Sequence, residues 1–386
     1  MGLRSVSVIG IGSTPFARLE GRSLLDLVNQ ACNEAIADAH IARDKIQSFY
    51  LGNYSAGILI GQETLAPKAS YGLGLQGIPP TRVEGACASG GIAFRHAYLM
   101  IATGLIDFAL VAGAEKMTEA TTERNTAALA AAADELENRC GLTYAGAFGI
   151  WAHRHMHDYG TTRKQIALVS VKNKRNGMRN PRAQLKKEIT TDDVLNSRLI
   201  ADPLRLYDCC PISDGAAALV LCPTTIAKDY TKKPIEIMGS GQALGTINIY
   251  EADSLTAFSA TIRAAKQAFE MAGLTHNRVD VVELHDCFTM AEIIDSEDLG
   301  FFEKGKGGPA VEEGLTQVDG RIPINPSGGL LSKGHPVGAT GCGQVYELVK
   351  QLREEHENQV KNAEIGLAHN LGGTGSVSTV HILRRK

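Results

Sequence analysis

The chain has 386 residues, of which 44% are hydrophobic and 21% are charged, and its formal net charge is -3 at pH 7. This length exceeds one ordinary core and predicts two or three domains of a globular protein. The small negative charge argues against a general nucleic-acid binder, and no apolar run reaches the length of a membrane span. We therefore expect a cytoplasmic protein with neither nucleic-acid nor membrane partners.

The first elements predict an α/β unit. Residues 5–13 form an apolar strand that closes on Gly-x-Gly, and residues 35–53 are typical of an alanine-rich helix followed by a second strand. The third glycine of a dinucleotide-binding fingerprint is missing, and Pro15 stands near its place. The sequence therefore does not predict a bound nicotinamide cofactor.

A glycine-rich turn around Cys87 is the first candidate site. Residues 81–84 end a predicted strand, and residues 88–104 place apolar side chains at the three- and four-residue spacing of a helix. A helix N-terminus directs backbone N–H groups toward the sulfur and so favours the reactive thiolate. The alternative role for Cys87 is that of a small buried hydrophobe, as for most free cysteines.

Residues 116–220 interrupt the α/β pattern. Helices are predicted over residues 127–137, 147–159 and 163–178. We interpret this stretch as an inserted, mainly helical subdomain.

Five side chains of this insertion are candidates for binding a substrate. Met117, Phe148 and Trp151 would suit the wall of a pocket, with core packing as the alternative. Lys172 and Arg175 belong to a basic run that would hold phosphate groups, although such a run is usually a solvated surface.

The second half of the chain repeats the order of the first. Residues 234–242 resemble residues 5–13, and residues 268–286 align without gaps on residues 35–53. A glycine-rich turn and helix follow again over residues 338–351. The pattern predicts two duplicated α/β halves with central mixed sheets.

We place the boundary between the halves at residue 230. The N-terminal half covers residues 1–230 and includes the insertion at about 116–220, and the C-terminal half covers residues 231–386. The strand ends of the two halves would bring their glycine-rich loops together, where open α/β folds bind ligands.

Three reactive side chains of the second half are candidates for a site shared with Cys87. His285 and Cys287 stand in the sequence ELHDCF, and His335 stands in KGHPVGATG. Cys287 is alternatively a buried thiol at a strand end, and His335 a histidine held beside a helix start by Pro336.

A metal site is not predicted. The eight cysteines form no CxxC pair, so reduced thiols are expected. Zinc at His285 with Cys287, or at Cys209 with Cys210, lacks the usual ligand spacing. The HxHxH run at residues 153–157 places its first and third histidines on one helical face, where such a pair can bind metal, but a solvated or partly buried helix face is the favoured interpretation.

Five motifs in order carry a resemblance to a known family. They are VEGACASGG around Cys87, GAEKMTE at 113–119, ISDGAAALVL at 212–221, INPSGGLLSKGHPVGATG at 324–341, and the closing HNLGGTG. Over essentially its whole length the chain resembles the thiolases, closest to the sterol-carrier-protein type and its archaeal and bacterial relatives. Most thiolases have a second reactive cysteine where this chain has His369, and in the sterol-carrier type the HDCF cysteine, here Cys287, takes over that task.

The resemblance implies two-step acyl transfer on coenzyme A thioesters, with no tightly bound cofactor. Cys87, activated by His335, would form an acyl-enzyme, and Cys287 would take the α-proton of a second acyl-CoA. His285 and His335 would stabilise the enolate oxygen, and the backbone N–H groups of Cys87 and Gly372 the tetrahedral oxygen.

Run backwards, the same groups would cleave a 3-ketoacyl-CoA. In HDCF, Asp286 is expected to orient its neighbours rather than to act as a base. Neither the acyl chain nor the physiological direction follows from the sequence, and acetoacetyl-CoA is one candidate product.

The sequence is also compatible with other functions. A 3-ketoacyl or hydroxymethylglutaryl-CoA synthase would share the duplicated fold and a Cys–His site, and a non-catalytic acyl-CoA-binding subunit would share the fold alone. The resemblance further implies at least a homodimer, paired through the N-terminal halves. A small zinc-containing OB-fold subunit is a candidate partner, and the chain could be a subunit that works only with it.

Overall fold

The computed structural model describes residues 2–386. Nine strands among these residues form one mixed sheet, in the order β3-β2-β4-β7-β1-β8-β11-β10-β9. The strands of the sheet are β1 (Val6–Ser13), β2 (Ser48–Gly52), β3 (Pro80–Val83), β4 (Ala109–Glu115), β7 (Gly215–Pro223), β8 (Ile235–Leu244), β9 (Val281–Glu283), β10 (Ile365–Gly372) and β11 (Val377–Arg385). A separate hairpin consists of β5 (Leu199–Ala201) and β6 (Leu204–Arg205).

The sheet repeats one arrangement in its two parts. In the first part β4 runs parallel to β2 and antiparallel to β7, and in the second part β10 runs parallel to β9 and antiparallel to β11. Strands β1 and β8 pair antiparallel, with Val8 opposite Ile235, and so join the parts. The predicted mixed α/β fold with duplicated halves is confirmed, and the structure adds that the two sheets are continuous through this pair.

The helices follow the strands in chain order. The α-helices are α1 (Leu24–Asp38), α2 (Ala56–Ile60), α3 (Leu65–Gly72), α4 (Ser89–Ala102), α5 (Thr122–Ala130), α6 (Glu135–Arg139), α7 (Tyr144–Tyr159), α8 (Arg163–Gly177), α9 (Thr191–Asn196), α10 (Ser259–Ala272), α11 (Thr289–Asp298), α12 (Gly307–Glu312), α13 (Gly329–Lys333) and α14 (Thr340–Arg353). Short 3-10 helices are η1 (Arg43–Lys45), η2 (Ala86–Ala88), η3 (Leu206–Asp208), η4 (Thr224–Asp229), η5 (His276–Arg278) and η6 (Val337–Ala339). No helix among the described residues has the length and apolar character that a membrane span needs.

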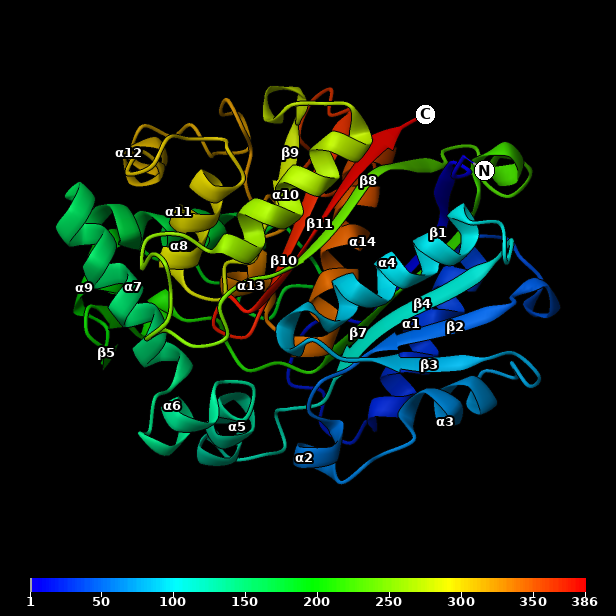
Figure 1. Ribbon diagram of the computed structural model, residues 1–386, viewed down its shortest axis with the longest axis horizontal. Helices are drawn as coiled ribbons and strands as arrows, with labels where there is room; N and C mark the ends of the chain where they lie inside the picture. Colours follow the sequence, from blue (N-terminus) through cyan, green and yellow to red (C-terminus); the bar gives the residue numbers. More distant parts are fainter. Residues whose placement is uncertain (1) are drawn as a thin grey trace.

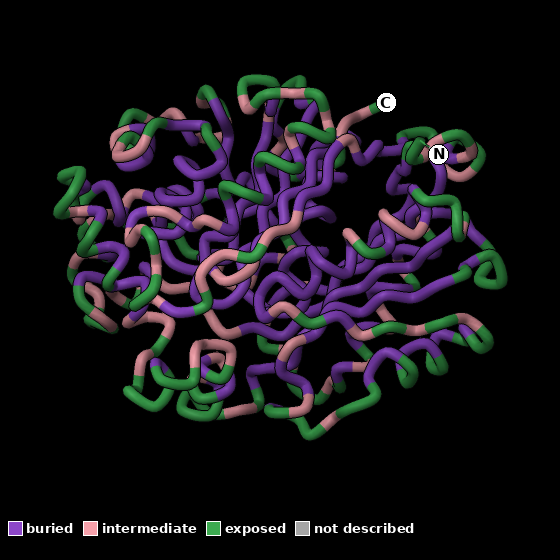
Figure 2. Tube along the Cα trace, viewed as in Figure 1, coloured by how far each residue is buried: buried purple, intermediate pink, exposed green. Residues whose placement is uncertain are grey.

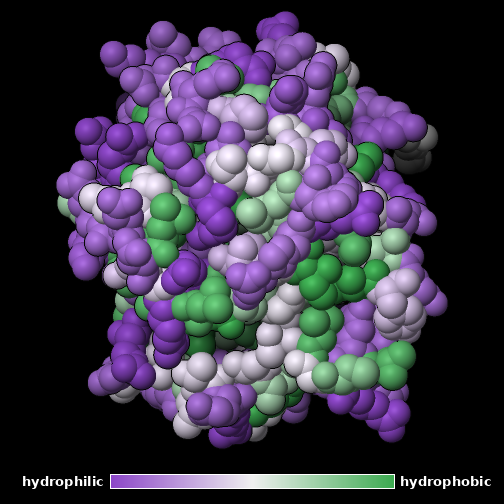
Figure 3. Space-filling view, turned by 90° about the vertical axis from the view of Figure 1, so that its left-hand side faces the viewer, coloured by the Kyte–Doolittle hydropathy of each residue, from purple (hydrophilic) through white to green (hydrophobic). Residues whose placement is uncertain are grey.

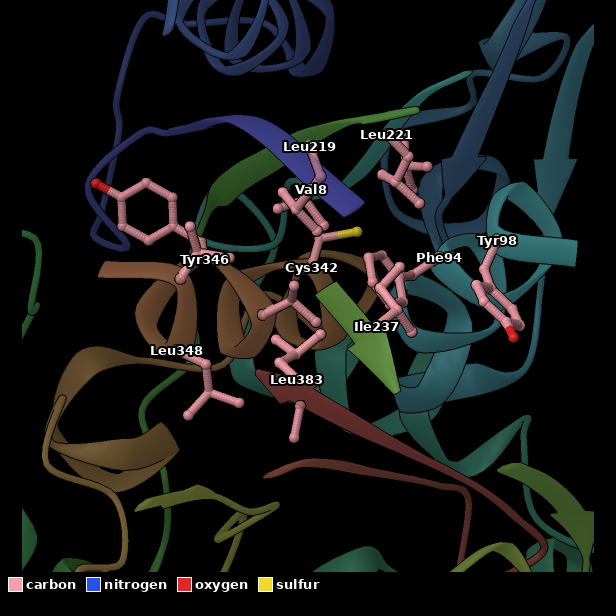
Figure 4. Close-up of a cluster of buried hydrophobic side chains, with 14 of the residues drawn as sticks. Val8, Phe94, Tyr98, Leu219, Leu221, Ile237, Cys342, Tyr346, Leu348 and Leu383 are labelled. Atoms are coloured by element: carbon pink, nitrogen blue, oxygen red, sulfur yellow. The ribbon is translucent and has the colours of Figure 1, made fainter. Parts of the chain in front are cut away.

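Helices α4 and α14 lie between the two parts of the sheet (Figure 1). Their side chains share one core with residues of both parts, for example Phe94 and Cys342 with Leu219 and Leu383 (Figure 4). Helix α1 covers the other face of the first part, and α10 the other face of the second. The layers therefore alternate between helices and sheet, with one helix pair at the centre.

Burial follows these layers (Figure 2). Every residue of α14 except Lys350 is buried, because the helix is enclosed on all sides. Helix α10 instead buries alanines at three- and four-residue spacing, including Ala260, Ala264 and Ala268, and exposes its remaining face.

The insertion is mainly helical, as predicted, but one predicted helix is wrong. Residues 127–137 contain the end of α5 and the start of α6 rather than one helix. The break lies before Asp134, whose carboxylate accepts hydrogen bonds from the backbone N–H groups of Leu136 and Glu137 and so caps a new helix. The other two predicted helices correspond to α7 and α8.

We expect Gly341→Ala to destabilise the protein, because α4 and α14 touch through their glycines. A Cβ atom at Gly341 would lie 2.2 Å from the backbone nitrogen of Gly91, and backbone cannot move aside cheaply. The free energy of unfolding, measured in urea, should fall by about 1 to 3 kcal/mol. As the control, Gly146→Ala adds a Cβ at ordinary contact distance in α7 and should leave stability equal or higher. Equal stability of the two variants would contradict this account of the central layer.

Candidate active site

Cys87 lies on a strained turn between β3 and α4. Ala86, directly before it, has a φ of 49°, a left-handed conformation that residues with a side chain rarely adopt. Ser89 holds the turn from below, since its hydroxyl accepts from the N–H of Gly85 and donates to the carbonyl of Ala86. The turn thereby presents the Cys87 sulfur at the N-terminus of the helical segment, as predicted from the sequence.

The structure brings Cys87 together with both histidines named from the sequence. The sulfur of Cys87 and one ring nitrogen each of His285 and His335 all lie within 4.8 Å of one another. The two imidazole rings are 5.0 Å apart between centroids and nearly perpendicular, at 84°. All three side chains are buried, so the group sits in a setting from which bulk water is largely excluded.

Hydrogen bonds determine which nitrogen of His335 carries the proton. The Thr340 hydroxyl donates to the carbonyl of Pro336, so it accepts from His335 Nδ1 at 2.7 Å. His335 Nε2 then has a free lone pair, and this buried atom has no hydrogen-bond partner within residues 2–386. Burial lowers the pKa of His335 to about 3, so the ring is neutral at pH 7. The arrangement makes Nε2 a proton acceptor.

His285 has the opposite tautomer. The side-chain oxygen of Asn370 accepts from the N–H of Gly91, which orients the amide so that its nitrogen donates to His285 Nδ1 at 3.1 Å. His285 Nε2 must therefore carry the proton in the neutral ring. Burial, and then the nearby rings of His335 and His369, hold the pKa of His285 well below its usual value. One imidazole is thus a neutral donor and the other a neutral acceptor.

The environment of Cys87 keeps its thiol protonated. Burial, together with the Glu115 carboxylate, raises the pKa of Cys87 to about 12, although backbone N–H groups of Gly373 and of Cys87 itself point at the sulfur and oppose the shift. A thiol in this state is a poor nucleophile until a base removes its proton. His335 Nε2 is such a base, because its lone pair is free.

Glu115, at the end of β4, ties together the loops around Cys87 and His335. Its buried carboxylate accepts from the backbone N–H groups of Tyr54, Ser55 and Gly338, and from the side chain of Asn53. Burial raises the pKa of Glu115, and these donors oppose that shift. The carboxylate links one loop of each half of the chain at the site.

Cys287, on the loop that follows β9, is not a member of the 4.8 Å cluster, but it is near enough to Cys87 for the two thiols to interact electrostatically. Its pKa is raised well above the usual value, first by burial and then by the neighbouring thiols of Cys210 and Cys87. The backbone N–H of Cys210 donates to the carbonyl of Cys287 at 3.0 Å, which anchors this loop to the insertion. Cys287 also shares a hydrophobic cluster with Phe148 and Phe288, whose rings stack at 4.6 Å.

Two other predicted pocket residues lie near the site. Met117 shares a small buried cluster with Cys87. Trp151 lines a cavity of about 190 Å³ together with Thr374 and Gly375, the residues that follow Gly373. Gly372 itself pairs with Val377 in the ladder between β10 and β11.

Lys172 and Arg175 do not join this group. The ammonium of Lys172 is buried and lies 2.9 Å from a carboxylate oxygen of Glu292, so its charge is already compensated. Arg175 is exposed and lines a second cavity, bounded by the segments before β9 and after α14. Lys172 and Arg175 belong to one basic run of the sequence and lie about one turn apart on α8. Lys172 faces the buried Glu292, whereas Arg175 faces the cavity.

His369 and Asp286 contact the backbone of the segments that carry the site residues. His369 Nδ1 faces the backbone N–H of His285 at 3.5 Å, and its Nε2 lies 2.9 Å from the hydroxyl of Thr261. Asp286 accepts from the backbone N–H groups of Leu330 and Leu331 at the start of α13. The carboxylate of Asp286 thus holds two neighbouring segments together, which is a structural role.

Sequence reasoning missed the residues that set the proton positions. Thr340 stands in GATG and Asn370 in HNLGG, inside motifs that the sequence already singled out. Their roles depend on which ring they face, and only the folded chain reveals that.

The cluster of Cys87, His285 and His335 has the residue types of a metal site. Binding a metal through His285 Nε2 would require that nitrogen to lose its proton. Asn370 donates to Nδ1 of the same ring, and this hydrogen bond keeps the proton on Nε2. The hydrogen bonds around the ring therefore disfavour a metal ligand at His285.

The other two candidate metal groups have different partners. In the HxHxH run, His155 is buried and bonded to Thr161 and Glu297, while His153 and His157 are exposed and contact Asp202 and Asp158. Cys209 and Cys210 are free thiols at the edge of the Cys287 loop.

Comparison with known proteins identifies a family for most of the chain. The family model described as "Thiolase, N-terminal domain" matches residues 6–225, and the one described as "Thiolase C-terminal domain-like" matches residues 241–385. An acetyl-CoA acetyltransferase of Methanothermobacter thermautotrophicus is 48% identical over 385 residues, covering 99% of this chain and all of that protein. Sterol carrier protein 2 of Bos taurus is 37% identical over 96% of this chain and 71% of that protein.

A solved structure is similar over almost the whole chain. The structure named "Ltp2-ChsH2(DUF35) aldolase" superimposes with a TM-score of 0.86 at 26% identity, covering 99% of this chain and 98% of that one. The chain belongs to the thiolase family, as the order of its motifs predicted.

We expect Thr340→Val to slow the chemical step, because the variant removes the acceptor that holds the proton on His335 Nδ1. The unpartnered N–H would favour the other tautomer, whose Nε2 cannot take a proton. Since leaving a buried donor unpaired costs about 1 to 3 kcal/mol, the turnover number should fall about ten- to hundredfold. Thr340→Ser keeps the hydroxyl and should restore most of the rate. If the serine variant is as slow as the valine variant, the methyl group rather than the hydroxyl matters and the tautomer argument fails.

Proposed function

We propose that Cys87 carries an acyl group between two coenzyme A thioesters, and that acetoacetyl-CoA is the product formed from, or cleaved to, two acetyl-CoA molecules. The single observation that carries this proposal is the placement of a buried thiol between a neutral imidazole donor and a neutral imidazole acceptor. The chain is a CoA-dependent thiolase, an acyltransferase. A ketoacyl or hydroxymethylglutaryl-CoA synthase is not favoured.

In the first step the thiol proton of Cys87 passes to His335 Nε2, and the sulfur attacks the thioester carbonyl. The carbon–sulfur bond to coenzyme A then breaks and leaves an acyl group on Cys87. Burial holds Cys287 protonated at this point, so it must lose a proton before it can act as a base. The Cys287 proton passes to the departing thiolate of coenzyme A, and this proton transfer completes the first step.

In the second step the Cys287 thiolate takes the α-proton of a second acyl-CoA. The carbanion attacks the acyl carbon on Cys87, a carbon–carbon bond forms, and the released sulfur takes back the proton held by His335. Two acyl-CoA molecules thus give one 3-ketoacyl-CoA and one coenzyme A, with every proton accounted for. The reverse sequence is thiolysis.

The N–H of His285 Nε2 stabilises the enolate oxygen that develops in the second step. A donor of this kind is commonly worth about 3 kcal/mol when it is already in place. For the tetrahedral oxygen on the acylated sulfur we propose the backbone N–H groups of Cys87 and of the loop at Gly372 and Gly373. Support for Gly373 comes from the direction of its N–H, which points at the Cys87 sulfur.

The cavity beside Gly373 is our candidate for the acyl or pantetheine channel. Its volume of about 190 Å³ is bordered by Trp151 and Phe258, whose rings are 5.0 Å apart. The indole N–H of Trp151 is buried without a hydrogen-bond partner among residues 2–386, and an amide of a pantetheine arm would satisfy it. Coenzyme A is thereby proposed as a substrate rather than a resident cofactor.

Separate roles for the two thiols predict different failures. Cys87→Ala should show neither acylation by acetyl-CoA nor turnover. Cys287→Ala should still gain one acetyl group, more slowly because solvent must then protonate the departing coenzyme A, and should condense about 10² to 10⁴ times more slowly. Mass spectrometry of the intact protein after brief exposure to acetyl-CoA distinguishes the two. Cys140→Ala alters an exposed thiol and serves as the control with full activity. Equal acetyl gain by wild type and Cys87→Ala would refute the assignment.

Assembly is a separate part of the proposal. In the N-terminal half, Ile58, Ile60 and Tyr71 expose apolar side chains on α2 and α3, which supports a homodimer through this half. Figure 3 shows hydrophobic patches among hydrophilic residues on the face that carries α7, α8 and α9. A small zinc-containing OB-fold subunit is proposed for that face, with support from the DUF35 component in the name of the similar structure. The cytoplasmic location stays a prediction.

A charge placed in the N-terminal interface should separate the dimer. Light scattering should give a mass twice 41.2 kDa for wild type and near 41.2 kDa for Ile60→Glu, because a carboxylate cannot be buried unpaired between subunits. Leu105→Glu, at an exposed site between α4 and β4, should remain dimeric. A monomeric wild type, or an unchanged mass for Ile60→Glu, would contradict the proposed interface.

A further inference from the structure

A cavity at the far end of the C-terminal half has no part in the proposed chemistry. It has a volume of about 820 Å³, within the range of small-molecule sites. Its walls come from the end of α8, the segment before β9, residues 317–323 and the segment after α14.

The cavity is remote from Cys87. Lys361, in the wall of the cavity, lies just before β10 begins. Gly373 lies just after β10 ends, and its N–H points at the Cys87 sulfur. Eight residues of strand separate the two by about 26 Å, at about 3.3 Å per residue. A ligand here would not touch the reacting atoms.

Four exposed cations border this cavity: Arg175, Arg179, Arg321 and Lys361. The three arginines donate hydrogen bonds to uncharged groups. Arg175 donates to the side chain of Gln317, Arg179 to that of Asn358, and Arg321 to the backbone carbonyl of Phe301. No carboxylate of residues 2–386 forms an ion pair with any of the four. The charges are therefore available to a ligand.

The walls contain two acidic residues, Asp280 and Asp319, so the four cations leave a net positive charge. Asp280 already accepts from the backbone N–H groups of Glu364 and Ile365 and so faces the protein. Asp319 is exposed at the rim.

Buried amides make the floor rigid. Asn176 donates to the carbonyl of Asn325, and Asn358 donates to the carbonyl of Pro326. Both amides are almost fully buried, with exposed fractions of 4% and 2%. The floor is therefore held in place before any ligand arrives, which reduces the ordering cost of binding.

We propose that this cavity binds a small molecule with two or more phosphate groups. Planar guanidinium groups match phosphate oxygens in pairs, and a lysine adds a mobile charge. Several cations around one preformed cavity suit a chain of phosphates better than a single one. The site is separate from the acyl-CoA site and does not depend on the proposed catalytic roles.

Inorganic tripolyphosphate is the probe, and calorimetry on the full chain is the measurement. Wild type should bind one equivalent, and the double variant Arg179→Gln/Lys361→Gln should bind at least about tenfold more weakly, because two charge-assisted contacts are lost. The matched control Lys187→Gln/Lys266→Gln removes the same net charge from exposed positions elsewhere and should bind like wild type. Circular dichroism on each variant checks that the fold is retained.

Three results would overturn the proposal. They are absence of saturable binding to wild type, equal weakening in the cavity and control variants, and binding of citrate as tight as that of tripolyphosphate. The last result would mean a general anion surface rather than a phosphate site.

Discussion

Helices α4 and α14 pack closely against each other, and this contact sets where the two halves of the site lie. Each helix comes from one half of the duplicated chain, and both are enclosed between the two parts of the sheet. Cys87 precedes one helix and His335 precedes the other, so the approach of the two helices brings thiol and imidazole together. Glycine at the contact permits that approach, because a Cβ at Gly90 or Gly341 would meet backbone of the other helix or of the turn before it.

Uncharged hydrogen bonds, rather than ion pairs, then prepare the reactive groups. Thr340 and Asn370 hold the two imidazoles in opposite tautomers, and burial keeps both rings neutral. A preformed donor and a preformed acceptor need little rearrangement when charge develops on a substrate. The same burial that makes the thiols of Cys87 and Cys287 unreactive at rest leaves proton transfer to a specific partner as the route to reactivity.

Buried carboxylates hold the loops that carry these groups. Glu115 joins the loop after β2 to the loop of His335, and Asp286 holds the segment after β9 to the start of α13. Both accept mainly from backbone N–H groups, which act only at short range and in a fixed direction. Such ties explain how a site assembled from distant segments keeps one geometry.

The amino-acid sequence alone predicts the mixed α/β class, the duplication, the family and the candidate reactive residues, because periodicity and motifs are local signals. It did not determine the tautomers of His285 and His335, the break at Asp134 or the separate fates of Lys172 and Arg175. The tautomers and the surroundings of the two cations depend on which side chains meet in the folded chain, whereas the break at Asp134 is a local helix cap that the alanine-rich pattern does not reveal. A basic run looks uniform in sequence, yet a helix directs its successive side chains toward different neighbours. The folded chain is therefore needed to show that Lys172 is paired with Glu292 while Arg175 borders a distant cavity.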